Sequence, residues 1–93
     1  MLSAYPACFI KEEGRYSVIF PDLNHLATCG RTLEEAQNMA VDCLAGYLLW
    51  LLEDGEPIPP ASPADKIHLA EIVEEAESSD AFVDVVAVDI AEY

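Results

Sequence analysis

Three cysteines and two histidines could carry the most specific chemistry in this chain, but their spacing fits no known reactive site. Cys8, Cys29 and Cys43 include no Cys-x-x-Cys pair, and an odd number does not suit a disulfide framework. His25 and His68 fall in no zinc-ligand spacing with these cysteines. We therefore predict three reduced core cysteines, with no catalytic residue, no metal and no cofactor.

Carboxylates are the abundant reactive groups. The chain has 18 Asp and Glu against 4 Lys and Arg, for a net charge of −14. The excess is concentrated from Glu53 onward, where twelve acids meet one base, against six acids and three bases before it. Such a surface repels nucleic acid and anionic lipid, and it attracts a basic protein. The alternative is that the acidity only keeps the protein in solution.

Length and hydropathy predict a single cytoplasmic domain spanning residues 1–93. Ninety-three residues, of which 53% are hydrophobic, suit one modest core. The N-terminus does not have the pattern of a signal peptide. The longest apolar run, residues 44–52, is about half of what a bilayer span needs. No membrane contact and no small-molecule substrate are expected.

Four strands and one long helix would position these groups. A helix starts at Thr32, because Thr32 followed by Glu35 forms a capping box, and it stops at Gly55. Ser62 and Pro63 start a second, acidic helix after the proline-rich segment Glu56–Pro63, here called the strap. Alternating or β-branched residues predict strands at Leu2–Ile10, Tyr16–Phe20, Ala27–Gly30 and Phe82–Ile90.

The long helix has an apolar stripe and an apolar end. The stripe recurs every three or four residues, at Leu33, Ala36, Ala40, Cys43, Tyr47 and Leu51. Near its end the helix is apolar on every side. We expect the core, a second copy of the chain or a partner to cover the patch formed there by Leu48, Leu49, Trp50 and Leu52.

The element order β-β-β-α-(α)-β predicts an α+β fold. The simplest arrangement is a mixed sheet of spatial order 3-2-1-4, with the long helix packed on one face. The last strand would return by a right-handed crossover and lie parallel to the first. The other face would be free for self-association or for a partner.

Four separated signatures carry a resemblance to a known family. They are residues 5–7 (Tyr-Pro-Ala), Gly14 with residues 16–23 (Tyr-Ser-Val-Ile-Phe-Pro-Asp-Leu), the pattern Thr28-x-Gly30-x-Thr32-x-Glu34-Glu35-Ala36, and residues 55–59 (Gly-Glu-Pro-Ile-Pro). In this order and spacing they resemble the HicB-like antitoxin domain, from about Ala4 to Ser62.

The resemblance implies a partial ribonuclease H-like fold. It also implies a partner, a small basic RNA-cleaving toxin of the HicA type, and homodimers or higher assemblies. Many family members carry a C-terminal DNA-binding segment, whereas this sequence stops at Tyr93 after its most acidic part. We therefore expect no direct nucleic acid binding by this chain alone.

Two features of the sequence bear on the site. Nuclease chemistry on such a fold needs converging carboxylates, yet the first strand, Leu2–Ile10, has none to join Glu34, Glu35 and Asp84, so no enzyme is expected. The family loop after Pro-Asp-Leu often reads Pro-Gly-Cys, but here it is Asn24-His25-Leu26. The candidate partner contacts are Asp22, Leu23, Asn24, His25, Glu34 and Glu35.

Each candidate also has a plainer interpretation. Pro21-Asp22 makes a turn, His25 is an exposed loop residue, and Glu34 and Glu35 favour the helix N-terminus. Two functions remain open. The chain is either an antitoxin that masks the RNA-binding surface of a basic toxin, or a solitary interaction or regulatory domain without a toxin.

Overall fold

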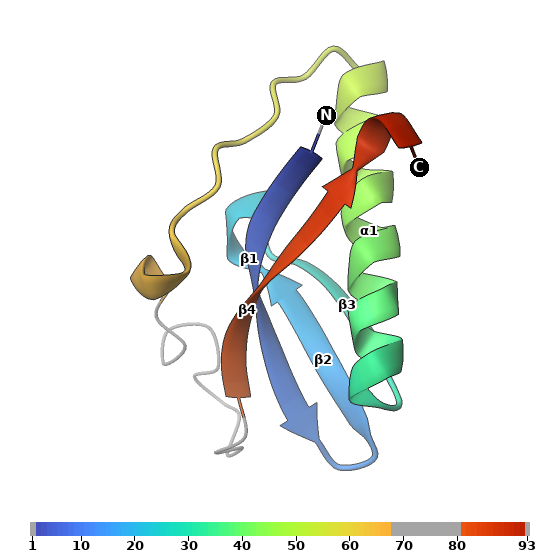
Figure 1. Cartoon of the computed structure of the whole chain (residues 1–93), viewed down its shortest axis with the longest axis vertical. Helices are drawn as coiled ribbons and strands as arrows, with labels where there is room; N and C mark the ends of the chain where they lie inside the picture. Colours follow the sequence, from blue (N-terminus) through green and yellow to red (C-terminus); the bar gives the residue numbers. More distant parts are fainter. Residues whose placement is uncertain (1, 68–80, 93) are drawn as a thin grey trace.

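One four-stranded sheet in the order β3-β2-β1-β4 carries the single long helix, α1, across one face (Figure 1). The computed structural model describes residues 2–67 and 81–92. Its elements are β1 (Leu2–Glu12), β2 (Arg15–Phe20), η1 (Pro21–Leu23), β3 (Leu26–Gly30), α1 (Leu33–Glu53), η2 (Ala64–Lys66), β4 (Ala81–Asp89) and η3 (Ile90–Glu92). The predicted α+β class and the strand order are confirmed.

The direction of β4 was predicted wrongly. β4 runs antiparallel to β1, with Leu2 opposite Asp89 and Ile10 opposite Ala81, so the sheet is fully antiparallel rather than mixed. The expectation treated the connection from β3 to β4 as a right-handed crossover, which would leave β4 parallel to β1. Figure 1 shows that the strap descends beside the sheet from the end of α1 to η2, against the direction of α1, and β4 then starts at the lower end of the sheet.

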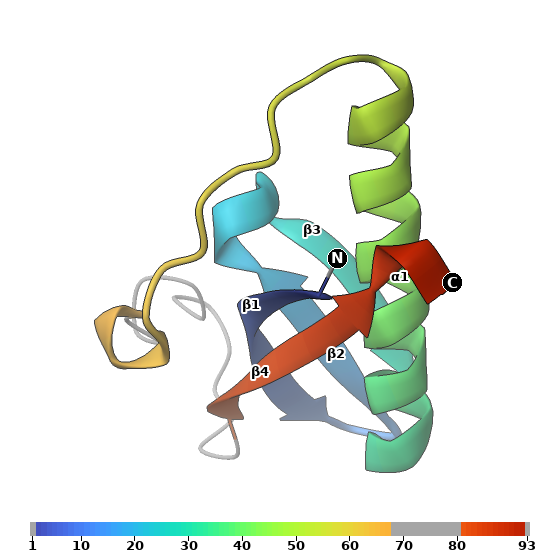
Figure 2. The same ribbon diagram turned by 45° about the horizontal axis from the view of Figure 1, so that its top comes forward.

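α1 and the strap flank the sheet on opposite sides, as the tilted view shows (Figure 2). The core lies under α1, where side chains from β1, β2 and β4 meet a row from the helix. That row runs through Leu44 and Leu48, both fully buried, whereas Cys43 and Tyr47 of the predicted stripe lie half-buried at its flank. The buried row and the predicted stripe are both apolar at helical spacing, so periodicity alone could not show which of the two faces the sheet.

Both ends of α1 follow from local sequence. The Thr32 side chain accepts a hydrogen bond from the Glu35 N–H at 3.1 Å, as a capping residue should. The Glu35 carboxylate was expected to reach back to Thr32, but it accepts from the Arg31 N–H at 3.2 Å. At the other end Gly55 has a left-handed φ of 68°, and the Glu56 N–H donates to the Leu51 carbonyl at 2.9 Å. This is the Schellman ending that Gly55 predicts.

Pro6 sits within β1 without breaking the sheet. It lies opposite Val85, whose N–H is hydrogen-bonded to the Asp84 carboxylate at 2.9 Å rather than to β1. Pro6 and Val85 therefore form a pair that exchanges no backbone hydrogen bonds, and the missing N–H of proline costs nothing there. On the other side, the pairing of β1 with β2 begins only at Cys8.

The described residues do not show the predicted start of a second helix. Ala64–Lys66 forms one 3-10 turn, η2, which Ser62 does not cap, and Ile67 after it is extended. Instead Ser62 bonds to Asp22, on the loop between β2 and β3. The rest of the predicted helix, including Leu69, Ile72 and Val73, lies outside the residues that the structure describes.

Candidate partner interface

Asp22 holds the strap against the sheet. Its carboxylate accepts two hydrogen bonds from Ser62, one from the backbone N–H at 2.6 Å and one from the hydroxyl at 2.8 Å. Nearby, the Tyr5 hydroxyl donates to the Pro59 carbonyl, and Ile58 packs on the core. Burial, and secondly the negative charge of Asp22, raise the pKa of the Tyr5 phenol, which keeps the donor protonated. Asp22 is thus primarily a structural residue.

Asn24 and His25 are exposed and held in an unusual backbone conformation. Their φ angles are 62° and 58°, in the left-handed region that side chains other than glycine rarely adopt. Asn24 ends η1, and the chain then turns directly into β3. A histidine held this way typically costs of the order of 1 kcal/mol, which the surrounding contacts offset. The geometry presents both side chains outward in fixed positions.

Two of the singled-out leucines are covered by the core. Leu23, a predicted partner contact, is 1% exposed, and Leu48, of the predicted apolar patch, is fully buried. Leu23 anchors η1 in the core, and Leu48 belongs to the row of α1 that faces the sheet. In the sequence, Leu23 stands in a polar loop and Leu48 is one of several leucines, so the burial of these two side chains could not be predicted.

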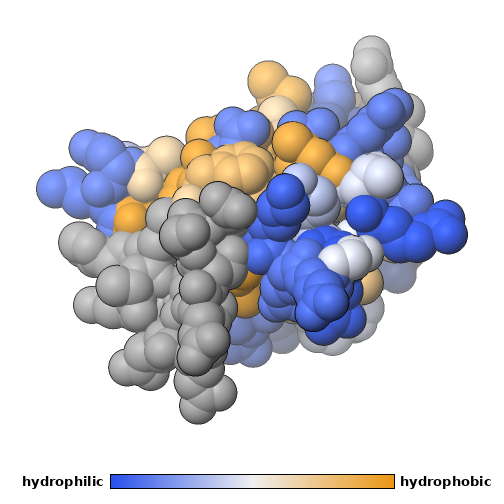
Figure 3. Space-filling view, turned by 90° about the horizontal axis from the view of Figure 1, so that it is seen from below, coloured by the Kyte–Doolittle hydropathy of each residue, from blue (hydrophilic) through white to orange (hydrophobic). Residues whose placement is uncertain are grey.

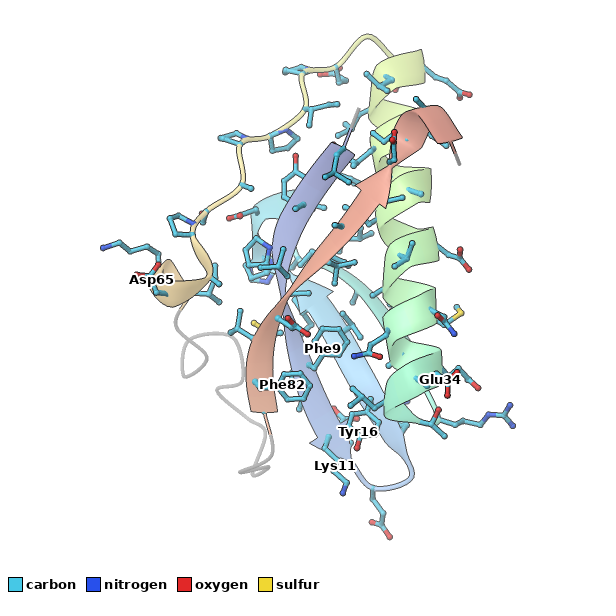
Figure 4. All side chains as sticks on the ribbon, viewed as in Figure 1. Phe9, Lys11, Tyr16, Glu34, Asp65 and Phe82 are labelled. Carbon is cyan, nitrogen blue, oxygen red and sulfur yellow. The ribbon has the colours of Figure 1, made fainter. Side chains whose placement is uncertain are left out.

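Glu34 and Glu35 stand at the first turn of α1 with different surroundings. Glu34 is exposed and points away from the sheet (Figure 4). Glu35 accepts from the Arg31 backbone N–H at 3.2 Å and meets its guanidinium at 3.5 Å. These hydrogen bonds, the backbone one first, lower the pKa of the Glu35 carboxyl. Glu35 is therefore engaged within the chain, whereas Glu34 remains available at the surface.

The predicted contact residues do not form one site. Asn24 and His25 precede β3, and Glu34 follows it, so the two groups stand at opposite ends of that strand. Five residues of strand separate them by roughly 17 Å. A partner that touched both would have to span β3 along its full length.

The end of α1 carries an exposed apolar patch, which we define as Trp50 and Leu52. Their exposed fractions are 53% and 48%, whereas Leu49 is half-buried and packs against the core. Tyr47 lies beside Trp50, with ring centroids 6.0 Å apart. Acidic residues follow at once, because Glu53, Asp54 and Glu56 are all exposed and the last turn holds no basic residue.

The cysteines and carboxylates form no reactive cluster in the part of the chain that the structure describes. Within residues 2–67 and 81–92, no three His, Cys, Asp or Glu residues gather to hold a metal ion. All three cysteines are free thiols, and burial raises the pKa of Cys8 and Cys43. Cys29 is exposed on β3 and is not the core residue that was expected.

No helix in the described ranges is long and apolar enough to cross a bilayer.

Asp84 is the functional candidate that sequence reasoning overlooked. It lies on β4, an edge strand, and helps to line a pocket of about 180 Å³ with Gln37 and Val41 of α1. The predicted strand order already placed β4 at an edge of the sheet, and the structure adds the pocket that Asp84 lines. Phe9 of β1 forms part of the same pocket and stacks on Phe82 of β4 (Figure 4).

Two curated relatives of the chain are bacterial antitoxins. The chain is 41% identical over 58 residues to antitoxin HicB 1 of Photorhabdus laumondii, covering 62% of this chain and 37% of that protein. It is 34% identical over 89 residues to antitoxin HicB 2 of the same organism, covering 83% and 64% respectively. The chain thus spans between roughly a third and two thirds of the length of these relatives.

Solved structures share the fold. A toxin-antitoxin complex from Streptococcus pneumoniae matches with a TM-score of 0.88 at 28% identity, over 100% of this chain and 73% of that one. The N-terminal domain of antitoxin HicB from Burkholderia pseudomallei matches with a TM-score of 0.67 at 25% identity, over 94% and 99%. Residues 4–73 match the model of the HicB_like antitoxin of bacterial toxin-antitoxin systems, and the chain therefore belongs to the HicB-like antitoxin family.

Proposed function

We propose that this chain is an antitoxin that binds a small basic RNA-cleaving toxin of the HicA type and masks the toxin's RNA-binding surface. The observation that carries the proposal is the match of residues 4–73 to the antitoxin family. The likeness to one chain of a toxin-antitoxin complex at 28% identity supports it.

The charge of the chain supports the mode of action. A toxin that binds RNA needs a basic surface, and this chain carries a net charge of −14. Three of its four basic residues lie in the β1–β2 hairpin or at the start of α1, where Arg15 pairs with Glu12 at 3.0 Å and Arg31 with Glu35 at 3.5 Å. The acids at the other end of α1 have no such neighbours in sequence. The chain would therefore compete with RNA for the toxin by electrostatic mimicry, and no chemical step is required.

The remaining features of the proposal follow from this mode of action. The chain acts as a single HicB-like domain in the cytoplasm, without catalysis, without a small-molecule substrate and without binding nucleic acid itself. Asn24, His25 and Glu34 are the predicted contacts whose side chains remain available to a toxin. The patch of Trp50 and Leu52 would serve self-association.

Co-expression tests the proposal directly. The genes beside the gene for this chain would be searched for a small basic protein of the HicA type. That protein would be expressed alone and together with the chain, and growth and the integrity of cellular mRNA would be followed. We expect the chain to restore growth and to co-purify with the toxin, and rising salt to release it because screening weakens charge attraction. Continued RNA cleavage with the chain in excess would refute the antitoxin function and favour a solitary domain.

A further inference from the structure

The outer edge of β4 offers backbone groups for another strand. β4 is the last strand of the sheet, and nine residues long. The N–H of Val85 turns away from β1, because it bonds to the Asp84 carboxylate at 2.9 Å. By the alternation of an antiparallel ladder, the N–H groups of Val83 and Ala87 also face outward. Of the strands in the described ranges, β1 alone pairs with β4.

This edge lacks several of the features that usually prevent strand addition, and its only charged residues are Asp84 and Asp89. β4 contains no lysine, no proline and no glycine, and its sequence is Ala-Phe-Val-Asp-Val-Val-Ala-Val-Asp. Phe82 is 37% exposed and Val85 51% exposed. Seen from below, apolar surface lies between hydrophilic side chains at this end of the molecule (Figure 3). A long apolar edge in a very acidic protein is suited to a specific partner strand.

A pocket opens beside the same edge. It has a volume of about 180 Å³ and lies between the first half of α1 and β4. Phe9, Val41 and Val86 supply apolar walls, and Gln37 and Asp84 supply the polar groups. Asp84 is exposed, and it contributes the sole charged group among the residues that line this pocket.

Apolar walls with one carboxylate suit a lysine or arginine side chain. The methylene stem of such a side chain can lie on apolar surface while its cationic head pairs with an acid. We propose that an extended segment of the basic partner adds to the outer edge of β4 and places a lysine or arginine in this pocket, on Asp84. The inference rests on the proposed function, since the basic partner is the toxin.

Strand addition would release Asp84 for this role. In the chain alone, its carboxylate accepts from the Val85 N–H, which is the donor that an incoming strand needs. A partner carbonyl would take over that N–H, as in other cases of strand addition. The carboxylate would then exchange a backbone donor for a cation, and charge-assisted pairs are the stronger of the two.

Charge disfavours a second copy of the chain as the occupant of this edge. Two copies paired through β4 would bring two Asp84 carboxylates close to the symmetry axis. Each copy also carries a net charge of −14. Repulsion between like charges would oppose this arrangement, whereas the same charges attract a basic segment.

The test uses the full chain and a purified small basic toxin of the HicA type. Asp84→Lys reverses the charge in the pocket, and Glu13→Lys makes the same change of charge at an exposed position in the turn between β1 and β2. Ala87→Pro removes an outward N–H without touching the ladder to β1. Dissociation constants and dissociation rates would be measured by surface plasmon resonance, and thermal unfolding would confirm that each variant is folded.

We expect Asp84→Lys and Ala87→Pro each to weaken toxin binding by about tenfold or more, mainly through faster dissociation, and Glu13→Lys by less than about threefold. If the wild-type chain binds the toxin and both β4 variants bind equally well, this inference is wrong and the antitoxin function stands. If the wild-type chain does not bind, the proposed function fails and the inference with it. If Ala87→Pro without toxin sediments differently from the wild-type chain, a second copy occupies the edge, and the proposal is overturned.

Discussion

Asp22 and Ser62 are 40 residues apart in sequence and are joined by two hydrogen bonds, from the Ser62 N–H at 2.6 Å and from its hydroxyl at 2.8 Å. One carboxylate thereby fixes the point at which the strap crosses the loop between β2 and β3. Because this loop also carries Asn24 and His25, the same bonds connect the strap to the exposed loop residues.

Replacing Asp22 should loosen the strap. Asp22→Ala removes both acceptors and leaves the Ser62 N–H without its partner, and we expect a loss of about 2 kcal/mol in the free energy of unfolding. Urea denaturation measures this loss, and hydrogen exchange of the Ser62 amide reports where it occurs. Asp65→Ala, an exposed acid on η2, is the matched control and should change stability by less than about 0.5 kcal/mol. Equal effects of the two substitutions would contradict the anchoring role.

Stability should fall at alkaline pH through Tyr5. Burial and the charge of Asp22 raise the pKa of its phenol above the usual 10.0, so the unfolded chain loses this proton at a lower pH than the folded chain does. The contribution is complete below pH 10.0 and declines as the pH rises through the folded pKa. Unfolding by urea at several pH values, together with the ultraviolet absorbance of tyrosinate, follows the change.

Tyr5→Phe separates this effect from general alkaline unfolding. The variant should lose about 1 kcal/mol at neutral pH, because the Pro59 carbonyl loses its donor, and its stability should fall less steeply at high pH. Tyr16→Phe, on β2, should behave like the wild type. An unchanged alkaline slope in Tyr5→Phe would show that another group controls it.

Two glycines should respond to alanine in opposite directions. A Cβ on Gly30 would stand 2.4 Å from the Ala36 nitrogen, where the start of α1 rests on β3, so Gly30→Ala should cost about 2 kcal/mol or more. A Cβ on Gly46 meets nothing within 4 Å on the exposed face of α1. Gly46→Ala should therefore stabilise the chain by up to about 1 kcal/mol. Thermal unfolding of both variants decides the point, and the same sign in both would be evidence against it.

Self-association through Trp50 and Leu52 should respond to salt in the opposite sense to toxin binding. The acids Glu53, Asp54 and Glu56 next to the patch repel a second copy, and salt screens that repulsion. Sedimentation of the chain alone should therefore show more dimer at high salt. Trp50→Ser should abolish the dimer, whereas Met39→Ser, which removes a 41% exposed side chain from the same helix, should keep it. A dimer that survives Trp50→Ser must use another surface.

Local features of the fold were predictable because short stretches of sequence determine them. Thr32 caps the helix, Gly55 ends it in a left-handed conformation, and the alternation of Tyr16, Val18 and Phe20 matches the inner face of β2. The order of the elements along the chain predicted the strand order. The capping and alternation signals extend over only a few residues, which is why the sequence shows them.

Features that depend on distant residues were not predictable. The direction of β4 depends on how far the strap travels, and the role of Asp22 depends on Ser62, which sequence reasoning had assigned to a helix cap. The burial of Leu48 and the exposure of Cys29 depend on the rotation of α1 and on the covering of the sheet. The importance of Asp84 emerged from the pocket beside the edge strand, and the sequence does not show this pocket.

The pairing of Leu2 with Asp89 also determines when the fold can be completed during synthesis. The groups of β1 that bond to β4 leave the ribosome before Ala81–Asp89, and they stay unpaired until β4 has been made. Until then Phe9 lacks its stacking neighbour Phe82, and the core lacks Val86 and Val88. Contacts between such distant residues form slowly. A nascent chain therefore stays vulnerable to proteases until β4 is synthesised, and any cut between β1 and β4 before that point prevents the sheet from closing.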